Sequence, residues 1–178
     1  MNFIITNVKE DTCTLEIEKN VSGNMGNKVR DFEFKLVSRT NLNGSYPVEI
    51  QKNGVFDHLE TIEFNGGIGQ TTIKLTHDQT AVITDLPKNT NMTVTEVGSE
   101  KMGYTVSSEV IHGDDPAVNG GEAPDLFLEE GVYTVKFNND LKSQIPTGVD
   151  VNAEATAVVF IGMLAVVTFL YMGRRREE

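Results

Sequence analysis

The sequence lacks several features on which a stable exported domain or an enzyme usually depends. Its 178 residues include one cysteine, Cys13, and no tryptophan, so no internal disulfide can form. The three histidines are scattered through expected turns, and Cys13, expected to precede the first strand, has no evident histidine partner. No Ser-His-Asp order, nucleophile elbow, phosphate-binding glycine loop or metal-ligand cluster is present. These absences predict a protein that is not an enzyme and uses no cofactor or metal.

Basic residues are also few. The 15 Lys and Arg stand against 26 Asp and Glu, which gives a formal net charge of −11. Such a charge argues against nucleic acid and anionic lipid as partners. The segment from His112 to Pro124 is the longest without a strand pattern, and it is acidic. Because it has no EF-hand spacing, we expect a solvated loop rather than a metal site.

Helical spacing is missing from the chain before its C-terminal region. Apolar and polar residues alternate instead in short runs separated by turns such as Asn53-Gly54 and Asn65-Gly66-Gly67. A period of two predicts strands that bury one face. Seven to nine such strands predict an all-β fold, an Ig-like or Greek-key antiparallel β-sandwich over residues 12–143. The runs are Leu15–Glu18, Phe32–Leu36, Thr72–Leu75, Met92–Thr95, Tyr104–Ser107 and Tyr133–Phe137.

One long apolar run lies near the C-terminus. About 19 uncharged residues, from Ala155 to Gly173, are just enough to cross a bilayer as a helix, so we expect a transmembrane helix over residues 151–173. Arg174, Arg175 and Arg176 follow it and predict a cytoplasmic basic tail over residues 174–178. The part before Gln144 is then expected to lie outside the cell.

A short turn motif precedes this predicted helix, within residues 144–150. It reads Ile145-Pro146-Thr147-Gly148, in which proline favours an extended backbone before it and glycine gives an accessible peptide bond. The order of turn motif, apolar helix and basic stop resembles the cell-wall sorting signal of Gram-positive surface proteins. The resemblance implies sortase cleavage between Thr147 and Gly148 and transfer of the threonyl carbonyl to peptidoglycan or to a pilin lysine. The motif departs from the usual LPxTG, which leaves the sortase class open.

Three polar residues fall at positions where the alternation calls for buried side chains. Lys19 shares a face with Leu15 and Ile17, Glu96 follows Met92 and Val94, and Asn139 follows Tyr133, Val135 and Phe137. Burying a lysine or a glutamate costs several kcal/mol unless the group is paired or neutral. Three inward polar groups on three strands therefore predict a site in the core of the sandwich.

The segments that carry these residues resemble a module of Gram-positive pilins and adhesins. The resemblance covers about residues 12–140, and it is strongest in LEIEKNVSGN, DLPKNTNMTVTEV and YTVKFNND. The family is that of collagen-adhesin B-type repeats and streptococcal pilin linkage domains. Membership implies an isopeptide bond between Lys19 and Asn139, promoted by Glu96. Such a bond is a single-turnover self-modification, and strand parity favours Asn139 over Asn138 as the acceptor.

The N-terminal residues lack the basic and apolar regions of a secretory signal. Phe3-Ile4-Ile5-Thr6-Asn7 resembles the run at residues 135–139, so residues 1–11 are expected to end an upstream repeat module, with Asn7 as its acceptor. The chain is then expected to be the last module of a longer protein.

These observations predict a structural or adhesive protein of a Gram-positive cell surface, anchored to the wall. The expected partners are a sortase, peptidoglycan and, through the C-terminal helix, the membrane. Two alternatives remain: a major or minor pilin subunit joined to another subunit, or an adhesin module that binds a host-matrix or cell-surface ligand. A shaft pilin also needs an acceptor lysine. Leu86-Pro87-Lys88-Asn89 fits the family's turn better, and Ser45-Tyr46-Pro47-Val48 has no lysine, so we favour wall anchoring.

Overall fold

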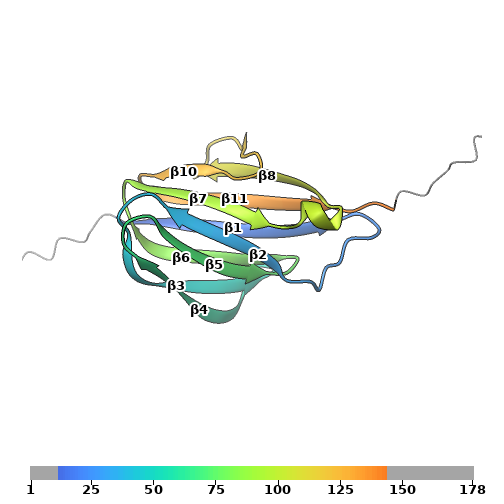
Figure 1. Ribbon diagram of the computed structural model, residues 1–178, viewed down its shortest axis with the longest axis horizontal. Helices are drawn as coiled ribbons and strands as arrows, with labels where there is room; N and C mark the ends of the chain where they lie inside the picture. The colour runs from blue at the N-terminus through green and yellow to red at the C-terminus, as the bar shows by residue number, and fades with distance from the viewer. Residues whose placement is uncertain (1–11, 144–178) are drawn as a thin grey trace, which may run out of the picture. The chain divides into compact units, whose positions relative to one another are not determined.

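The computed structural model describes residues 12–143, and these residues form a β-sandwich (Figure 1). The described part contains eleven strands and one short 3-10 turn. The elements, in chain order, are β1 (Thr12–Ser22), β2 (Phe32–Ser38), β3 (Asn43–Lys52), β4 (Val55–Asn65), β5 (Gly69–Leu75), β6 (Gln79–Pro87), β7 (Thr90–Val97), η1 (Glu100–Met102), β8 (Thr105–His112), β9 (Val118–Asn119), β10 (Asp125–Leu128) and β11 (Gly131–Asp140).

The strands form two sheets that face each other. The seven-stranded sheet has the order β4-β3-β6-β1-β11-β8-β9, and the four-stranded sheet has the order β10-β7-β2-β5. The prediction of an all-β sandwich is confirmed. The strand number exceeds the expected seven to nine, partly because the two-residue strand β9 lies inside the segment expected to be a loop.

One strand pair departs from the expected antiparallel arrangement. The first strand, β1, and the last strand, β11, are neighbours and run parallel, with Lys19 opposite Phe137 and Val21 opposite Asn139. Both arrows point to the same end of the sandwich in Figure 1. The chain therefore enters β1 at one end of the sandwich and leaves β11 at the other.

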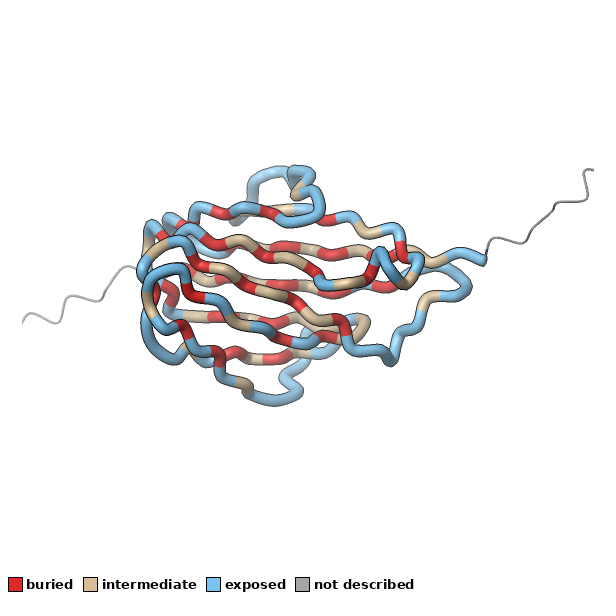
Figure 2. Tube along the Cα trace, viewed as in Figure 1, coloured by how far each residue is buried: buried red, intermediate tan, exposed pale blue. Residues whose placement is uncertain are grey.

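The core lies between the sheets and follows the alternation in the sequence. In β1, buried and partly exposed residues alternate from Thr12 to Lys19, and Figure 2 shows the same alternation along the other central strands. Leu15, Ile17 and Phe34 are completely buried. Cys13 is part of β1 and belongs to this core, so the expectation that it precedes the first strand is wrong. The strand begins earlier than its alternating run indicated.

The hairpin between β3 and β4 turns where the sequence predicts it. Asn53 and Gly54 have φ angles of 52° and 72°, and two consecutive positive φ angles are typical of the type I′ turn that Asn-Gly favours. This turn joins two long strands and places the tip of the hairpin beside the start of β6, where Lys52 lies opposite Gln79.

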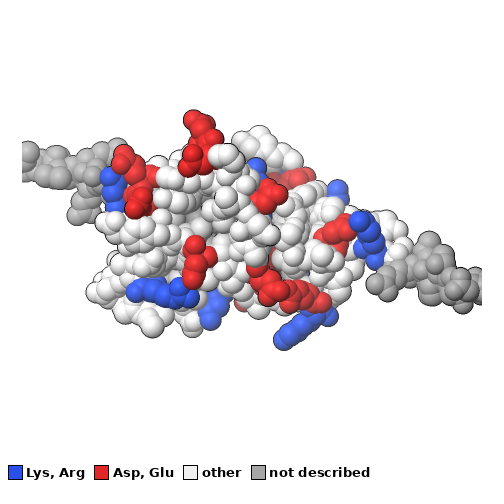
Figure 3. Space-filling view, turned by 90° about the horizontal axis from the view of Figure 1, so that it is seen from above, with Lys and Arg blue, Asp and Glu red and all other residues white. Residues whose placement is uncertain are grey.

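Charges are distributed over the outer surfaces. The face drawn in Figure 3 has acidic and basic side chains interspersed, with no continuous basic area among its described residues. Within residues 12–143, no helix has both the length and the apolar character needed to cross a membrane. The predicted transmembrane helix at 151–173, the basic tail at 174–178 and the segment 1–11 lie outside the described residues.

Candidate functional site: a buried Lys-Glu-Asn cluster

Three strands from both sheets place the three predicted polar side chains together in the core. Lys19 on β1 and Asn139 on β11 belong to adjacent parallel strands, and the register makes them diagonal neighbours on one face. Glu96 comes from β7 in the opposite sheet, where it lies opposite Phe34 of β2. The cluster therefore connects the first strand, the last strand and the facing sheet.

These polar groups are almost completely removed from solvent. The side chains of Lys19 and Glu96 are 0% and 1% exposed, and Asn139 is 0% exposed. Asn138, the alternative acceptor, lies on the outer face of β11, where its Oδ1 accepts a hydrogen bond of 3.0 Å from Asn20. The parity argument therefore gave the correct orientation for both asparagines.

Glu96 is the centre of the cluster. Its Oε2 lies 3.0 Å from the Nζ of Lys19, in a buried ion pair. Its Oε1 accepts hydrogen bonds from the Nδ2 of Asn139 and from the hydroxyl of Ser99. One carboxylate thus contacts both groups that an isopeptide bond would join.

An aromatic ring lies against the ammonium group of Lys19, and other rings pack nearby. The Nζ lies 4.5 Å from the centroid of the Phe32 ring, and Phe32 packs edge-on against Tyr104 with ring centroids 5.5 Å apart. Phe137, which lies opposite Lys19 in the register, packs edge-on against Phe34 at 5.1 Å. Glu96 is the counter-charge of the buried lysine.

Burial lowers the pKa of Lys19 from its usual value to about 8, although the charge of Glu96 and its hydrogen bond act in the opposite direction. Desolvation is the larger effect because the ammonium loses its hydration while it gains a single carboxylate. The neutral, nucleophilic amine is therefore more accessible near neutral pH than it is for a solvated lysine.

The asparagine amide has one unsatisfied atom. The Oδ1 of Asn139 is buried and has no hydrogen-bond partner among the described residues. In the structure the amide presents its nitrogen, and not this oxygen, to Glu96. In this arrangement the carboxyl group of Glu96 accepts hydrogen bonds from both Lys19 and Asn139.

Sequence reasoning missed Ser99 and the aromatic rings around the lysine. Ser99 follows the end of β7 in a turn, where strand alternation gives no information about direction. Phe32, Phe34 and Phe137 were recognised only as members of alternating runs. Their position around Lys19 depends on how the two sheets face each other, and no local pattern encodes that.

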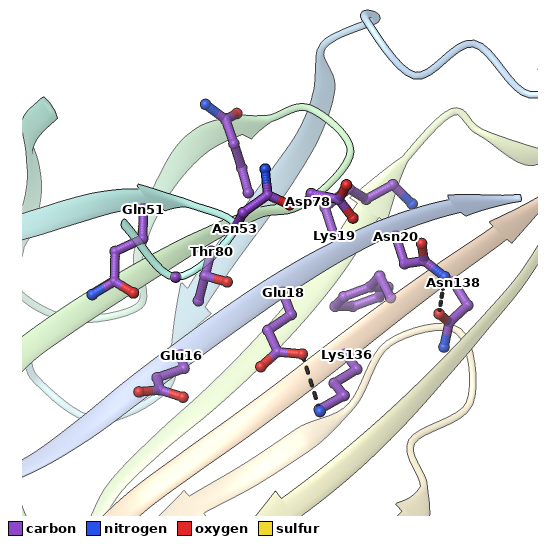
Figure 4. Close-up of a pocket in the computed structure, with 13 residues that line it drawn as sticks. Glu16, Glu18, Lys19, Asn20, Gln51, Asn53, Asp78, Thr80, Lys136 and Asn138 are labelled. Carbon is purple, nitrogen blue, oxygen red and sulfur yellow. Dashed lines mark hydrogen bonds and ion pairs between the residues drawn. The ribbon is translucent and has the colours of Figure 1, made fainter. Parts of the chain in front are cut away.

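A hollow of about 380 Å³ lies on the outer face of β1 and β11 (Figure 4). Polar pairs bridge the two strands there: Glu18 contacts Lys136 at 3.1 Å, and Asn20 donates to Asn138. These groups satisfy one another. The described residues contain no group of three or more His, Cys, Asp or Glu arranged to hold a metal ion.

The fold and the cluster define a class of protein, a β-sandwich module with a buried lysine, carboxylate and asparagine linking its terminal strands. Comparison with known proteins agrees with the fold. Residues 13–140 match the family model described as a domain of unknown function, DUF7601, and the chain belongs to that family.

The chain is also homologous to streptococcal pilin. It is 27% identical over 173 residues to a pilin of Streptococcus pyogenes serotype M1, covering 94% of this chain and 50% of the pilin. The chain thus spans about half the length of that curated relative.

Solved structures show the same fold. The major pilin of Streptococcus pyogenes matches with a TM-score of 0.65 and 23% identity, covering 75% of this chain and 49% of the pilin. The pilus-presented adhesin Cpa matches with a TM-score of 0.55 and 24% identity, covering 74% of this chain and 28% of the adhesin.

The other predicted site residues cannot be placed. Ile145, Pro146, Thr147 and Gly148 of the sorting motif, and the arginines at 174–176, lie outside the described residues.

Proposed function

We propose that this chain is the membrane-proximal stalk module of a pilin-like Gram-positive surface protein, stabilised by an autocatalytic isopeptide bond between Lys19 and Asn139. A sortase anchors it covalently to the cell wall by cleavage between Thr147 and Gly148. The observation that carries the proposal is the buried contact of one carboxylate, Glu96, with both Lys19 and Asn139.

The proposed reaction is an amide exchange that balances within the cluster. The Nζ of Lys19 gives one proton to Glu96 across the 3.0 Å contact and becomes a neutral amine. It then attacks the side-chain carbonyl carbon of Asn139 and loses a second proton. The bond between that carbon and Nδ2 breaks. Nδ2 takes up the second proton from Nζ and leaves as ammonia. The first proton stays on Glu96, or it passes to the ammonia, which then leaves as ammonium.

Glu96 supports this reaction as an acid and base held in a dry site. A carboxylate that accepts a proton from the nucleophile and returns one to the leaving group lowers the barrier to both steps. The unsatisfied Oδ1 of Asn139 is the atom on which negative charge develops during attack. A half-turn of the amide would direct this oxygen towards a protonated Glu96, which could then stabilise the charge by donating a hydrogen bond.

The position of the bond suits a protein that carries tension. The chain enters β1 at one end of the sandwich and leaves β11 at the other (Figure 1), so a pulling force acts along two neighbouring parallel strands. A bond between Lys19 and Asn139 would pass this force from the first strand to the last through covalent bonds. A disulfide cannot supply the same link, because the chain has one cysteine.

Intact-mass spectrometry of the folded chain tests the crosslink. We expect a mass lower than the sequence mass by one ammonia. Glu96→Gln, whose amide cannot accept the lysine proton, should keep the full sequence mass. Glu100→Gln, an exposed neighbour in η1, serves as the matched control and should lose ammonia like the wild type. Loss of ammonia in Glu96→Gln at the wild-type rate would remove the proposed role of this carboxylate.

A pilin subunit polymerised by a pilin sortase is the second candidate. The homology to a streptococcal pilin favours it. Polymerisation needs an acceptor lysine, and Lys88, in the turn after β6, contacts Glu130 at 3.3 Å. Covalent ladders of the native protein on denaturing gels would favour this alternative, whereas a single wall-linked species would favour anchoring.

A further inference from the structure

Ser99 breaks a local structural rule at the edge of the cluster. It occupies the N-cap position of η1, where a serine side chain commonly accepts a hydrogen bond from the backbone of the following turn. In this protein the side chain makes no capping bond, and its hydroxyl donates to the Oε1 of Glu96 instead. Ser99 is also 2% exposed, which is unusual for a serine in a turn.

The backbone holds Ser99 firmly in this place. Its carbonyl oxygen accepts hydrogen bonds from the amide nitrogens of Met102 at 3.0 Å and Tyr104 at 3.3 Å. Gly98, just before it, has a φ of 80°, a left-handed conformation that glycine adopts without strain. The turn after β7 therefore presents the hydroxyl to Glu96 from a fixed support.

We propose that Ser99 is a positioning residue for the isopeptide reaction, an inference that rests on the function proposed above. The terminal torsion of a glutamate is broad, so the backbone of β7 alone does not fix the plane of the carboxylate. Ser99 and Asn139 both donate to Oε1, which leaves Oε2 directed at the Nζ of Lys19. The hydroxyl keeps the proton-accepting oxygen in line with the nucleophile while the amide stays at the other oxygen.

A neighbouring hollow limits the expected size of the effect. Glu96 and Ser99 both line a hollow of about 120 Å³, together with Thr95, Gly98 and Val106. Water entering from this side can partly replace a missing hydroxyl. We therefore expect loss of the hydroxyl to slow the reaction by about tenfold, the effect of losing one hydrogen bond to a charged group, rather than to abolish it.

The test compares Ser99→Ala, Ser99→Thr and Ser99→Val with the wild type in the full-length chain. Each chain is made by cell-free synthesis with detergent, samples are quenched in acidic denaturant at successive times, and intact mass gives the fraction that has lost ammonia. Threonine keeps the hydroxyl, and valine has nearly the same shape without it. We expect Ser99→Thr to react at close to the wild-type rate, and Ser99→Ala and Ser99→Val to react about tenfold more slowly.

Melting temperatures distinguish a positioning role of Ser99 from a general effect of the substitutions on folding. Each substitution is repeated in an Asn139→Ala background, where no crosslink can form, and we expect the threonine and valine variants to melt at similar temperatures there. Equal reaction rates for threonine and valine would overturn the role of Ser99. The role would also be overturned if the variants that react slowly were the same ones that melt at a lower temperature in the Asn139→Ala background. A wild-type chain that never loses ammonia would refute the crosslink itself.

Discussion

Removing the acceptor amide with Asn139→Ala should lower the stability of the domain by an amount that the structure allows us to estimate. The bond from residue 19 to residue 139 closes a loop of about 120 residues, and by analogy with disulfide closure this stabilises by about 4–5 kcal/mol. For a domain of the described size, 1 kcal/mol shifts the melting temperature by about 3–4 °C. We therefore expect Asn139→Ala to melt roughly 15 °C below the wild type.

Besides the crosslink, the substitution changes the surroundings of the buried carboxylate, because Glu96 is then paired with an unmodified Lys19; the bond from Nδ2 to Glu96 in the unreacted site is lost in the crosslinked wild type too, since Nδ2 leaves as ammonia. A double-mutant cycle with Lys19→Met separates the two effects. Either single substitution removes the whole crosslink, so the double variant loses it only once. We expect the two single losses to exceed the double loss by about 4–5 kcal/mol.

The matched control is Asn138→Ala. Asn138 lies next to Asn139 in β11 and contributes an exposed bond to Asn20, so its loss should change stability by no more than about 0.5 kcal/mol. Thermal unfolding followed by circular dichroism, with denaturant titration as a second measure, gives the stabilities of the wild type, the two single variants of the cycle and the double variant. Additive losses for Lys19→Met and Asn139→Ala would refute the shared bond, as would equal destabilisation by Asn138→Ala.

Three further predictions concern reactivity and anchoring. The crosslinking rate should change little with pH from 6 to 8, because the proton that Lys19 gives to Glu96 stays within the cluster, and it should fall above pH 8, where Lys19, whose pKa burial lowers to about 8, has already lost that proton to solvent; a rate that rises tenfold per pH unit from pH 6 to 8, measured by intact mass, would contradict this. Cys13 should resist thiol reagents in the folded domain, since burial raises its pKa and its thiol donates to the Leu86 carbonyl at 3.3 Å. A colorimetric thiol assay with and without denaturant measures this reactivity, and rapid reaction of the native chain would contradict the prediction. Thr147→Ala should abolish wall attachment and leave the protein in the membrane fraction, and wall-linked Thr147→Ala protein after muramidase digestion would exclude the proposed cleavage.

Much of the site could be predicted because strand alternation has a period of two. Once Leu15 and Ile17 are assigned to the core, Lys19 must face inward as well, and the same argument applies to Glu96 and Asn139. Alternation does not say which strands are neighbours. The pairing of β1 with β11, which brings Lys19 near Asn139, was implied by the family resemblance, and its parallel direction was not expected.

The remaining features depend on contacts between distant segments. Ser99 lies in a turn, where side-chain direction has no period, and the strand β9 has only two residues. The direction of the Asn139 amide, whose nitrogen lies against Glu96, also depends on a contact between two strands far apart in the sequence.

Peptide mapping of the folded chain tests the Lys19–Asn139 bond most directly. Trypsin does not cleave after a lysine whose amine is acylated. Digestion should therefore yield a branched product in which residues 10–28 are joined to residues 137–142. Its mass should be lower by one ammonia than the summed mass of the two peptides. Tandem mass spectrometry should place the bond at Lys19 and Asn139. Recovery of cleavage after Lys19, together with an unmodified 137–142 peptide from the folded wild-type chain, would contradict the account.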